Sequence, residues 1–306
     1  MLSDRTKNLL KRIDEAKALI DKHRPLSKGI ISRLHTEMLV EWTYNSNAIE
    51  GNTLTLQETK LVLLEGITVR NKSLSEYLET INHRDAIEFV EELAESKHKI
   101  TERNIREIHS LILKEIDSEY AGKYRDINVR ISGSSHNPPN ALKVKELMRQ
   151  FSKTQLNTTE HPVVEAALAH HRLVSIHPFI DGNGRTARLL MNLILIKRGF
   201  FPAVILKNDR LKYYEVLEKA HKGKVDDFIF FIARSLERSI YLYFEAIPKI
   251  KDSLITLKEA SMISDYSTDY LNVMARRGTI PAFKIKRNWM VSKIAFKKYL
   301  NSKKKK

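Results

Sequence analysis

The stretch from His177 to Arg188 brings together side chains that can bind a phosphate and move a proton. Its two glycines, Gly182 and Gly184, let backbone N–H groups approach a ligand closely. An apolar helix is expected directly after it, and a helix N-terminus favours an anion. Two arginines add forked donors for phosphate oxygens. A histidine, with an ordinary pKa of about 6.5, suits a general base near neutral pH. Asp181 offers a hard oxygen of the kind that magnesium prefers.

Residue chemistry alone leaves two interpretations of this stretch open. It indicates an anion or nucleotide site, yet Gly182-Asn183-Gly184 is also compatible with an ordinary turn. The chain contains no GxxxxGK[ST] sequence, which excludes a phosphate loop of the Walker type. His170 and His171 precede the stretch, but their spacing is not HExxH and we interpret them as helix residues.

The string HPFIDGNGRTAR matches every fixed position of HxFx(D/E)GNGRxxR, the signature of the Fic family. The chain resembles Fic proteins from about Ser27 to Ile232. These are helical enzymes that most often transfer AMP from ATP to a Ser, Thr or Tyr hydroxyl of a protein. The resemblance implies a mainly α fold, a helical core with a small β-hairpin flap, ATP as substrate and Mg²⁺ as cofactor.

The resemblance also implies a role for each residue of the signature. His177 would take the proton from the target hydroxyl, Phe179 would anchor the loop, and Asp181 would be the metal ligand. Arg188 would hold the γ-phosphate. The implied nucleotide-binding residues are Asp181, Gly182, Asn183, Gly184, Arg185, Thr186, Ala187 and Arg188.

Two other segments resemble family features of the nucleotide site. Ile131-Ser132-Gly133-Ser134 corresponds to the flap over the nucleotide, and Tyr213-Tyr214 to a tyrosine pair near adenine and ribose. Without the family, the first is an ordinary hairpin and the second a pair of aromatics on a helix face. His221 stands seven residues after Tyr214, where relatives often have Asn, so its nucleotide contact is not implied.

An inhibitory feature is expected upstream of the signature. Ser46 and Glu50 are four residues apart, which places them on one face of a helix, and Gly51 is a helix stop. The segment resembles the inhibitory (S/T)xxxE(G/N) motif of Fic proteins, whose glutamate pairs with the second arginine of the signature, here Arg188. The resemblance implies low basal activity, and in some relatives the same glutamate supports AMP removal.

Helices must position these residues, because apolar side chains recur at helical spacing through most of the chain. Ser27 is expected to open one helix, and Thr55-Leu56-Gln57-Glu58 has the form of a capping box. Alternating apolar residues between Tyr124 and Pro139 predict a short hairpin or an extended flap instead. Other helices are expected around residues 9–20, 87–93, 105–112, 144–151, 163–177, 186–198, 211–217 and up to 247.

Composition bounds the class of protein. The 306 residues are 42% hydrophobic, enough for a sizeable core, and contain no cysteine for a disulfide or thiolate site. No apolar run approaches the roughly 18 residues of a membrane span, so no membrane partner is expected. The first residues lack the apolar stretch of a secretory signal, and a cytoplasmic location is expected. The formal net charge is +16.

Much of that charge lies at the C-terminal end. Residues 251–306 hold 14 basic and 4 acidic side chains, a net charge of +10, which fits a nucleic-acid partner or a solubilising tail. Helix starts near Leu254 and Ser267, an alternating run from Phe283 to Val291 and a last helix after Ser292 resemble an excisionase-like or MerR-like winged helix-turn-helix module. That resemblance implies duplex DNA as a partner, with contacts from Tyr270, Arg276, Arg277, Lys284, Lys286 and Arg287.

Three segments are therefore predicted. Residues 1–95 form an N-terminal helical region with the inhibitory helix, 96–248 the Fic catalytic core, and 252–302 the winged module. Three alternative functions remain open from the sequence: a protein adenylyltransferase, a DNA-binding regulator with a nucleotide-sensing core, or a transferase with another donor such as UTP. The partner is a protein bearing a hydroxyl, the chain itself included, and family behaviour adds a homodimer.

Overall fold

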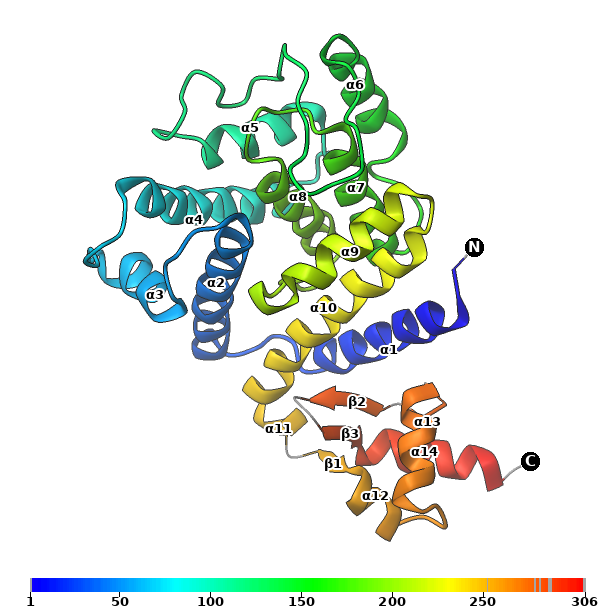
Figure 1. The fold of residues 1–306 in the computed structure, drawn as a ribbon. Coiled ribbons are helices and arrows are strands. Elements are labelled where there is room, and N and C mark those ends of the chain that lie inside the picture. Colours follow the sequence, from blue (N-terminus) through cyan, green and yellow to red (C-terminus); the bar gives the residue numbers. More distant parts are fainter. Residues whose placement is uncertain (1, 252, 278, 281, 286–287, 305–306) are drawn as a thin grey trace. The chain divides into compact units, whose positions relative to one another are not determined.

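The computed structural model describes residues 2–251, 253–277, 279–280, 282–285 and 288–304, and it is mainly helical (Figure 1). The bounds of its elements are α1 (Asp4–Asp21), α2 (Lys28–Glu50), α3 (Leu56–Glu65), α4 (Leu74–Glu95), α5 (Glu102–Ile112), η1 (Ala141–Lys143), α6 (Val144–Thr154), α7 (Pro162–Ile176), α8 (Asn183–Lys197), η2 (Lys207–Asp209), α9 (Arg210–His221), α10 (Val225–Ala246), α11 (Pro248–Lys251), β1 (Leu254–Thr256), α12 (Leu257–Met262), α13 (Thr268–Arg277), β2 (Ala282–Ile285), β3 (Asn288–Ser292) and α14 (Lys293–Lys304).

The chain forms two compact units. One comprises Thr36–Ser235, and the other combines Met1–His35 with Leu236–Lys306. The unit Thr36–Ser235 contains the whole signature and the expected inhibitory segment. The three segments predicted from the sequence stay a prediction.

Helix α8 is the centre of the unit Thr36–Ser235. It packs against α4, α5 and α7, which surround it (Figure 1). Its side chains from Arg185 to Leu195 are buried on every face, as expected for a helix in the middle of a core. Burying each Leu or Ile contributes about 1.5–3 kcal/mol. The first turn of α8, which carries the signature, is thus held on a rigid support.

Local sequence signals fix the ends of several helices. Thr55 and Glu58 form the predicted capping box at the start of α3, with both reciprocal hydrogen bonds present. Ser73 and Glu76 form another at the start of α4. At Ser27, the hydroxyl accepts a hydrogen bond from the Ile30 N–H at 3.4 Å, which confirms the expected start of α2.

Of the two forms predicted for the flap, the β-hairpin is wrong and the extended segment is confirmed. Residues 126–140 contain no strand, and their one tight turn is closed by Ser134 N–H donating to the Ile131 carbonyl at 3.2 Å. Backbone groups of this segment bond side chains instead of a partner strand: the carbonyls of Ile127 and Pro139 both accept hydrogen bonds from Arg125. The segment is an extended flap.

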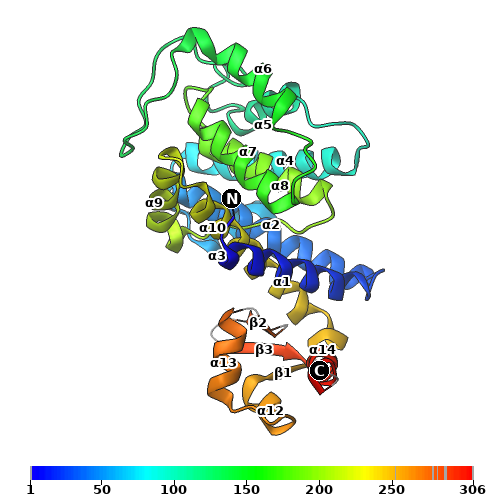
Figure 2. The ribbon, with the colours of Figure 1, turned by 90° about the vertical axis from the view of Figure 1, so that its right-hand side faces the viewer.

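The C-terminal part contains a small antiparallel sheet in the order β1–β3–β2 (Figure 2). Strand β1 corrects the sequence prediction, which began a helix near Leu254. The helix α12 starts only after Thr256, whose side chain forms a capping box with Glu259. The predicted hairpin, formed by β2 and β3, and the last helix are confirmed. One apolar cluster joins these elements: Leu257, Ala260, Leu271, Met274, Ala275, Ile280, Ala282, Val291 and Phe296.

Within its unit, the hairpin packs against the helices α1 and α10. The ring of Phe283 meets that of Phe244 edge-on at 5.2 Å between centroids, and the guanidinium of Arg12 lies 5.6 Å from the ring of Trp289. Arg12 also pairs with Glu237 at 3.1 Å, both side chains being buried. Among the described residues, no helix is both long enough and apolar enough to cross a membrane.

Candidate active site

The signature forms the connection between α7 and α8. His177 caps the end of α7 with φ 49°, a left-handed conformation that turns the chain away from the helix. Phe179 is fully buried, as predicted for a loop anchor, and its ring stacks on that of His109 at 3.6 Å between centroids. The Asn183 side chain closes the loop by accepting from Phe179 N–H at 3.0 Å and donating to its carbonyl at 2.9 Å. Asn183 therefore braces the loop.

His177 has the environment of a neutral base. Burial, together with the nearby Arg125, lowers its pKa to about 4. Its Nδ1 lies 3.4 Å from the Val174 carbonyl, which can only accept, so the proton is assigned to Nδ1. Nε2 then keeps its lone pair. Because the pKa lies well below 7, the imidazole is ready to accept a proton at neutral pH.

Arg188 reaches from α8 into a buried pocket of polar groups. Its Nε donates to Ser46 Oγ at 3.0 Å, and its Nη2 donates to the Ser46 carbonyl at 2.9 Å and to Glu50 Oε1 at 2.7 Å. Its Nη1 is buried and has no partner in the part of the chain that the structure describes. Burial disfavours the charged guanidinium, but Glu50 together with Tyr213 and Tyr214 outweighs it, and the pKa of Arg188 is raised.

Glu50 occupies the space directly above Gly184. A Cβ on Gly184 would lie 2.3 Å from Glu50 Oε1 and 3.1 Å from Arg188 Nη1. No side chain larger than hydrogen fits between this carboxylate and the first turn of α8. An anion already lies where a helix N-terminus, an arginine and a glycine form a binding place for one.

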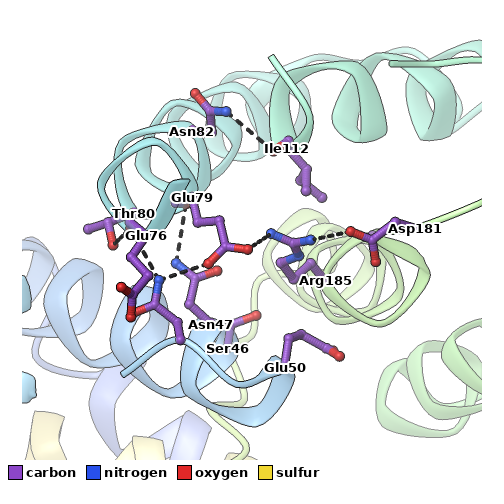
Figure 3. Close-up of polar contacts among 12 residues, drawn as sticks. Ser46, Asn47, Glu50, Glu76, Glu79, Thr80, Asn82, Ile112, Asp181 and Arg185 are labelled. Atoms are coloured by element: carbon purple, nitrogen blue, oxygen red, sulfur yellow. Dashed lines mark hydrogen bonds and ion pairs between the residues drawn. The ribbon is translucent and has the colours of Figure 1, made fainter. Parts of the chain in front are cut away.

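Arg185 points the other way, toward α4. Its Nη1 lies 3.2 Å from Glu79 Oε1 and its Nη2 lies 3.1 Å from Asp181 Oδ2 (Figure 3). Only 4% of the Arg185 side chain is exposed, against 71% of that of Asp181. Asp181 is thus a solvent-facing carboxylate attached to a buried cation. Gly182 differs from Gly184 in its neighbour: a Cβ on Gly182 would meet the His109 ring at 3.3 Å and not the Glu50 carboxylate.

The Asp181 carboxylate suits a magnesium ion that takes only one or two of its ligands from the protein. Among the described residues, no group of three or more His, Asp or Glu side chains could hold a metal ion. Mg²⁺ usually binds through one or two carboxylates, with water and substrate phosphates completing its shell. A single exposed carboxylate next to an anion cradle matches that donor set.

The predicted tyrosine pair lies on α9. Tyr213 is buried and its hydroxyl meets His170 Nε2 at 3.0 Å. Tyr214 is 36% exposed, and the guanidinium of Arg210 lies 5.0 Å from its ring. Burial and Glu50 raise the pKa values of both tyrosines, and Arg188 acts against this.

Helix α9 also holds the flap. Glu218 accepts hydrogen bonds from the Ser134 hydroxyl, from Ser135 N–H at 3.2 Å and from Ser135 Oγ at 2.7 Å. The ring of His136 stacks on that of His221 with 4.1 Å between centroids. His221 therefore contacts the flap here. Ser132 and Gly133 are exposed at the turn of the flap, and Ile131 is half-buried.

Two of the sequence-predicted residues turn into the core. Thr186 and Ala187 are fully buried. The Thr186 N–H and hydroxyl both donate to the Gly182 carbonyl at 2.9 Å. Thr186 thus supports the turn that begins α8, and Ala187 packs in the core.

Sequence reasoning missed four polar residues that hold the site. Arg125 donates to the His177 carbonyl at 2.8 Å, to Ile127 and to Pro139, and so ties the flap to the loop. His109 supports Phe179 and approaches the Asp181 carbonyl at 3.0 Å. Glu79 and Glu218 are the other two. Each lies on an ordinary amphipathic helix or next to the flap, far from the signature in sequence, and no local pattern distinguishes it.

The predicted DNA contacts are only partly described. Tyr270 is 53% exposed on α13, and Arg276 and Arg277 are exposed at the end of the same helix. The Arg277 carbonyl accepts from Asn8 Nδ2 at 3.1 Å. Lys284 lies in β2, paired with Trp289 across the hairpin, and Lys286 and Arg287 lie outside the described residues.

Comparison with known proteins identifies the family. The model of the Fic/DOC family matches residues 99–195. Protein adenylyltransferase Fic from Drosophila melanogaster is 36% identical over 249 residues, which cover 78% of this chain and 50% of that protein. Fic-1 (residues 134–508) from C. elegans superposes with a TM-score of 0.73 at 31% identity, over 79% of this chain and 72% of that chain. The chain belongs to the Fic family.

A second solved Fic structure agrees with this assignment. The Fic domain containing signaling protein from Bacteroides thetaiotaomicron matches with a TM-score of 0.70 at 30% identity, over 77% of this chain and 96% of that chain. The chain spans about half the length of the curated Fic relatives it matches.

Proposed function

We propose that this Fic protein is an adenylyltransferase, which transfers AMP from ATP to a Ser, Thr or Tyr hydroxyl of a target protein. The observation that carries the proposal is the anion cradle at the start of α8. Arg188 is buried there with Nη1 unpartnered among the described residues, and Gly184 leaves the space that a carboxylate now fills. A triphosphate offers the charge and oxygen acceptors that such a cradle binds.

His177 supplies the proton acceptor for the reaction. In the proposal its Nε2 takes the proton of the target hydroxyl as the oxygen attacks the α-phosphorus in line, and pyrophosphate leaves. The neutral state of His177 and the bracing of its loop by Arg125 and Asn183 support this role. Catalysis then rests on positioning and on charge neutralisation.

Asp181 would hold the magnesium ion that accompanies the nucleotide. When bound, this ion supplies positive charge that polarises phosphate oxygens and offsets the charge on the leaving group. The chain's own part is to present Asp181 to solvent while Arg185 holds it at 3.1 Å. Tyr213, Tyr214 and the flap residues Ile131 to Ser134 complete the proposed nucleotide site.

Glu50 is the proposed inhibitor of the same site. It pairs with Arg188 at 2.7 Å and fills the space above Gly184, while Ser46 holds two further Arg188 donors. A γ-phosphate in the same space would meet a negative charge and an arginine that is already engaged. We therefore propose low basal activity that rises when Glu50 is removed.

The test measures AMP incorporation from α-labelled ATP with Mg²⁺, with and without cell extract. We compare the wild type with Glu50→Gly, Glu50→Gln and the double variant Glu50→Gly/His177→Ala. The label should rise at least severalfold in Glu50→Gly and vanish in the double variant. Glu50→Gln keeps the shape of the side chain and removes its charge, so its activity should lie between that of the wild type and that of Glu50→Gly. Unchanged label in Glu50→Gly would refute the inhibitory role.

The same assay separates the alternative functions. A nucleotide-sensing regulator would bind ATP and give no label in any variant. A transferase with another donor would incorporate label from α-labelled UTP more strongly than from ATP. Label on the chain itself would show self-modification, and sedimentation of wild type and Glu50→Gly would show whether a homodimer accompanies inhibition. A cytoplasmic location stays an expectation.

The C-terminal part carries a second proposed function, binding of duplex DNA. Helix α13 buries Leu271, Met274 and Ala275 and leaves Tyr270 and Arg276 exposed on its other side. This leaves an aromatic and basic face free to contact a groove, in a segment of strongly positive charge. We propose a winged helix-turn-helix module that uses this face.

Fluorescence anisotropy with a labelled random duplex tests the DNA proposal. The dissociation constant should rise steeply with salt concentration, because bound phosphates release counterions. The pair Arg276→Ala/Arg277→Ala should weaken binding, whereas Glu259→Gln on α12, in a capping box away from that face, should not. Binding that is equally strong in the arginine variant would overturn the assignment of this face.

A further inference from the structure

Glu79 connects the inhibitory segment to the pair Arg185–Asp181. It lies in the second turn of α4, and Figure 3 shows it between the end of α2 and Arg185. Its Oε2 accepts from Asn52 Nδ2 at 2.8 Å and its main-chain carbonyl accepts from Asn47 Nδ2 at 3.2 Å. Asn47 and Asn52 flank Glu50 in sequence, so the contacts that fix the inhibitory segment also fix the Glu79 carboxylate.

The remaining oxygen of Glu79 serves Arg185. Oε1 lies 3.2 Å from Nη1, while Nη2 of the same guanidinium lies 3.1 Å from Asp181. Arg185 is 4% exposed, and Glu79 22%. A buried guanidinium must be neutralised by partners. Here two carboxylates share it: Nη1 serves Glu79 and Nη2 serves Asp181, while the buried Nε has no partner among the described residues.

The sharing of Arg185 between Glu79 and Asp181 determines how freely the Asp181 carboxylate can bind a cation. An arginine that has lost Glu79 would direct its whole charge to Asp181, because that carboxylate remains within reach of Nη2. The fork of the guanidinium binds a carboxylate through both oxygens when it can. A carboxylate so engaged is a poorer ligand for a divalent cation. With Glu79 in place, Asp181 keeps an oxygen that faces solvent.

We propose that Glu79 is a positioning residue: it shares Arg185 with Asp181, and it thereby keeps Asp181 available to the divalent cation that enters with the nucleotide. The inference rests on the proposed adenylyltransferase function and deepens it. It adds a residue outside the signature that the sequence does not distinguish. Removing a residue that hydrogen-bonds a metal ligand typically lowers the metal affinity about 10–100-fold.

Calorimetry in the Glu50→Gly background tests the inference without turnover. The affinity for the non-hydrolysable analogue β,γ-imido-ATP is measured in EDTA and over a series of Mg²⁺ concentrations. Glu79→Gln should raise the Mg²⁺ concentration needed for half of the affinity gain by about tenfold or more. Affinity in EDTA should change little, because Arg188 and Gly184 are untouched. Glu79→Asp keeps the charge and should restore part of the Mg²⁺ response.

Glu76→Gln is the matched control. Glu76 lies one turn before Glu79 on α4 and also accepts hydrogen bonds from the segment after Glu50, at Thr53. Its replacement should lower thermal stability and leave the Mg²⁺ dependence as in the parent. A structural effect alone would move both variants alike. If Glu79→Gln does not fold, the Glu79→Asp titration carries the test, with an expected shift in the same direction.

The outcomes separate the two proposals. A Glu50→Gly parent that binds no nucleotide and transfers no AMP would refute the proposed function itself. A parent that binds and transfers normally, combined with Glu79 variants whose Mg²⁺ response equals that of the parent, would overturn the role of Glu79 alone.

Discussion

The two arginines of the signature, Arg185 and Arg188, lie three residues apart on one helix and yet meet carboxylates of different kinds. Arg188 pairs with Glu50, the last residue of α2, which is followed by Gly51 with φ 110°. Arg185 pairs with Glu79, which lies inside α4 in its second turn. A helix end beside a glycine can move away, whereas a residue inside a packed helix cannot. The first pair suits a reversible inhibitor and the second a permanent support.

The buried charges show the same difference. Arg188 has one carboxylate partner and an unpartnered Nη1 among the described residues, so an added anion would gain a buried donor. Arg185 has two carboxylate partners, and its own buried Nε also has no partner among the described residues. An unsatisfied buried donor costs about 1–3 kcal/mol, and ligand oxygens are the natural group to satisfy it. We expect phosphate to compete with Glu50 for Arg188 and to leave the Arg185 pair intact.

The largest predicted effect is that of Arg188→Ala. It removes the partner of Glu50 and the phosphate donors together, so it should not activate the protein as Glu50→Gly does. In the Glu50→Gly background, AMP transfer should fall about 10²–10³-fold, the usual loss for one preorganised donor. Arg198→Ala is the control, because Arg198 ends the same helix and pairs with Glu165 at 3.0 Å away from the site. The measurement is the kcat of AMP transfer from labelled ATP, which should fall in Arg188→Ala and stay near the parent value in Arg198→Ala.

Activity of Arg188→Ala close to that of its Glu50→Gly parent would remove the distinction between the two arginines. It would mean that the phosphates are held elsewhere.

A smaller effect is predicted for Gly184→Ala. The new methyl group would lie 2.3 Å from Glu50 Oε1, so Glu50 must leave Arg188. The free energy of unfolding should fall by about 1–3 kcal/mol, as for an overpacked site. In the Glu50→Gly background this clash is absent, and the loss should be smaller. Urea unfolding of the wild type, Gly184→Ala, Glu50→Gly and the double variant gives the coupling energy between positions 184 and 50.

Gly29→Ala on α2 provides the additive control, since a Cβ there meets nothing within 4 Å. Equal losses for Gly184→Ala in both backgrounds would show that Glu50 does not press on this glycine.

The two arginines also mark how far the sequence could predict the site. The signature and Ser46-Asn47-Ala48-Ile49-Glu50-Gly51 lie in separate segments, and the motif resemblance predicted that Glu50 pairs with Arg188, which the structure has at 2.7 Å. Helices were predictable because their apolar spacing and capping boxes are local. Glu79 was not, because its role depends on α4 packing against α8, a contact between residues more than a hundred apart.

The hairpin form of the flap and the helix start near Leu254 were wrong predictions for a related reason. Alternation near Ile127, Val129 and Ile131 is typical of a strand, but a strand needs a partner, and here Glu218 and Arg125 take the hydrogen bonds. Leu254–Thr256 forms a strand because β3 lies beside it. Pairing partners are tertiary facts, and the local pattern carries no information about them.

The last prediction is a pH dependence of stability, and it concerns His83 on α4, which lies near enough to both arginines to feel their charge. His83 is fully buried, and burial, with Arg188 and Arg185 nearby, holds its pKa well below 6.5. Burial lowers the pKa values of His109, His171, His177 and His221 to about 4. In each case the unfolded chain binds a proton at a higher pH than the folded one. Stability should therefore fall as the pH drops from about 6.5 toward 4.

Calorimetric unfolding at several pH values between about 7 and 5 measures this dependence, since the slope counts the protons taken up on unfolding. His83→Gln should reduce the slope by the share of one group. The test bears on the comparison because His83 feels both cations at once. If His83→Gln left the slope at its wild-type value, burial beside the two arginines would not be what holds the pKa of His83 below that of the unfolded chain.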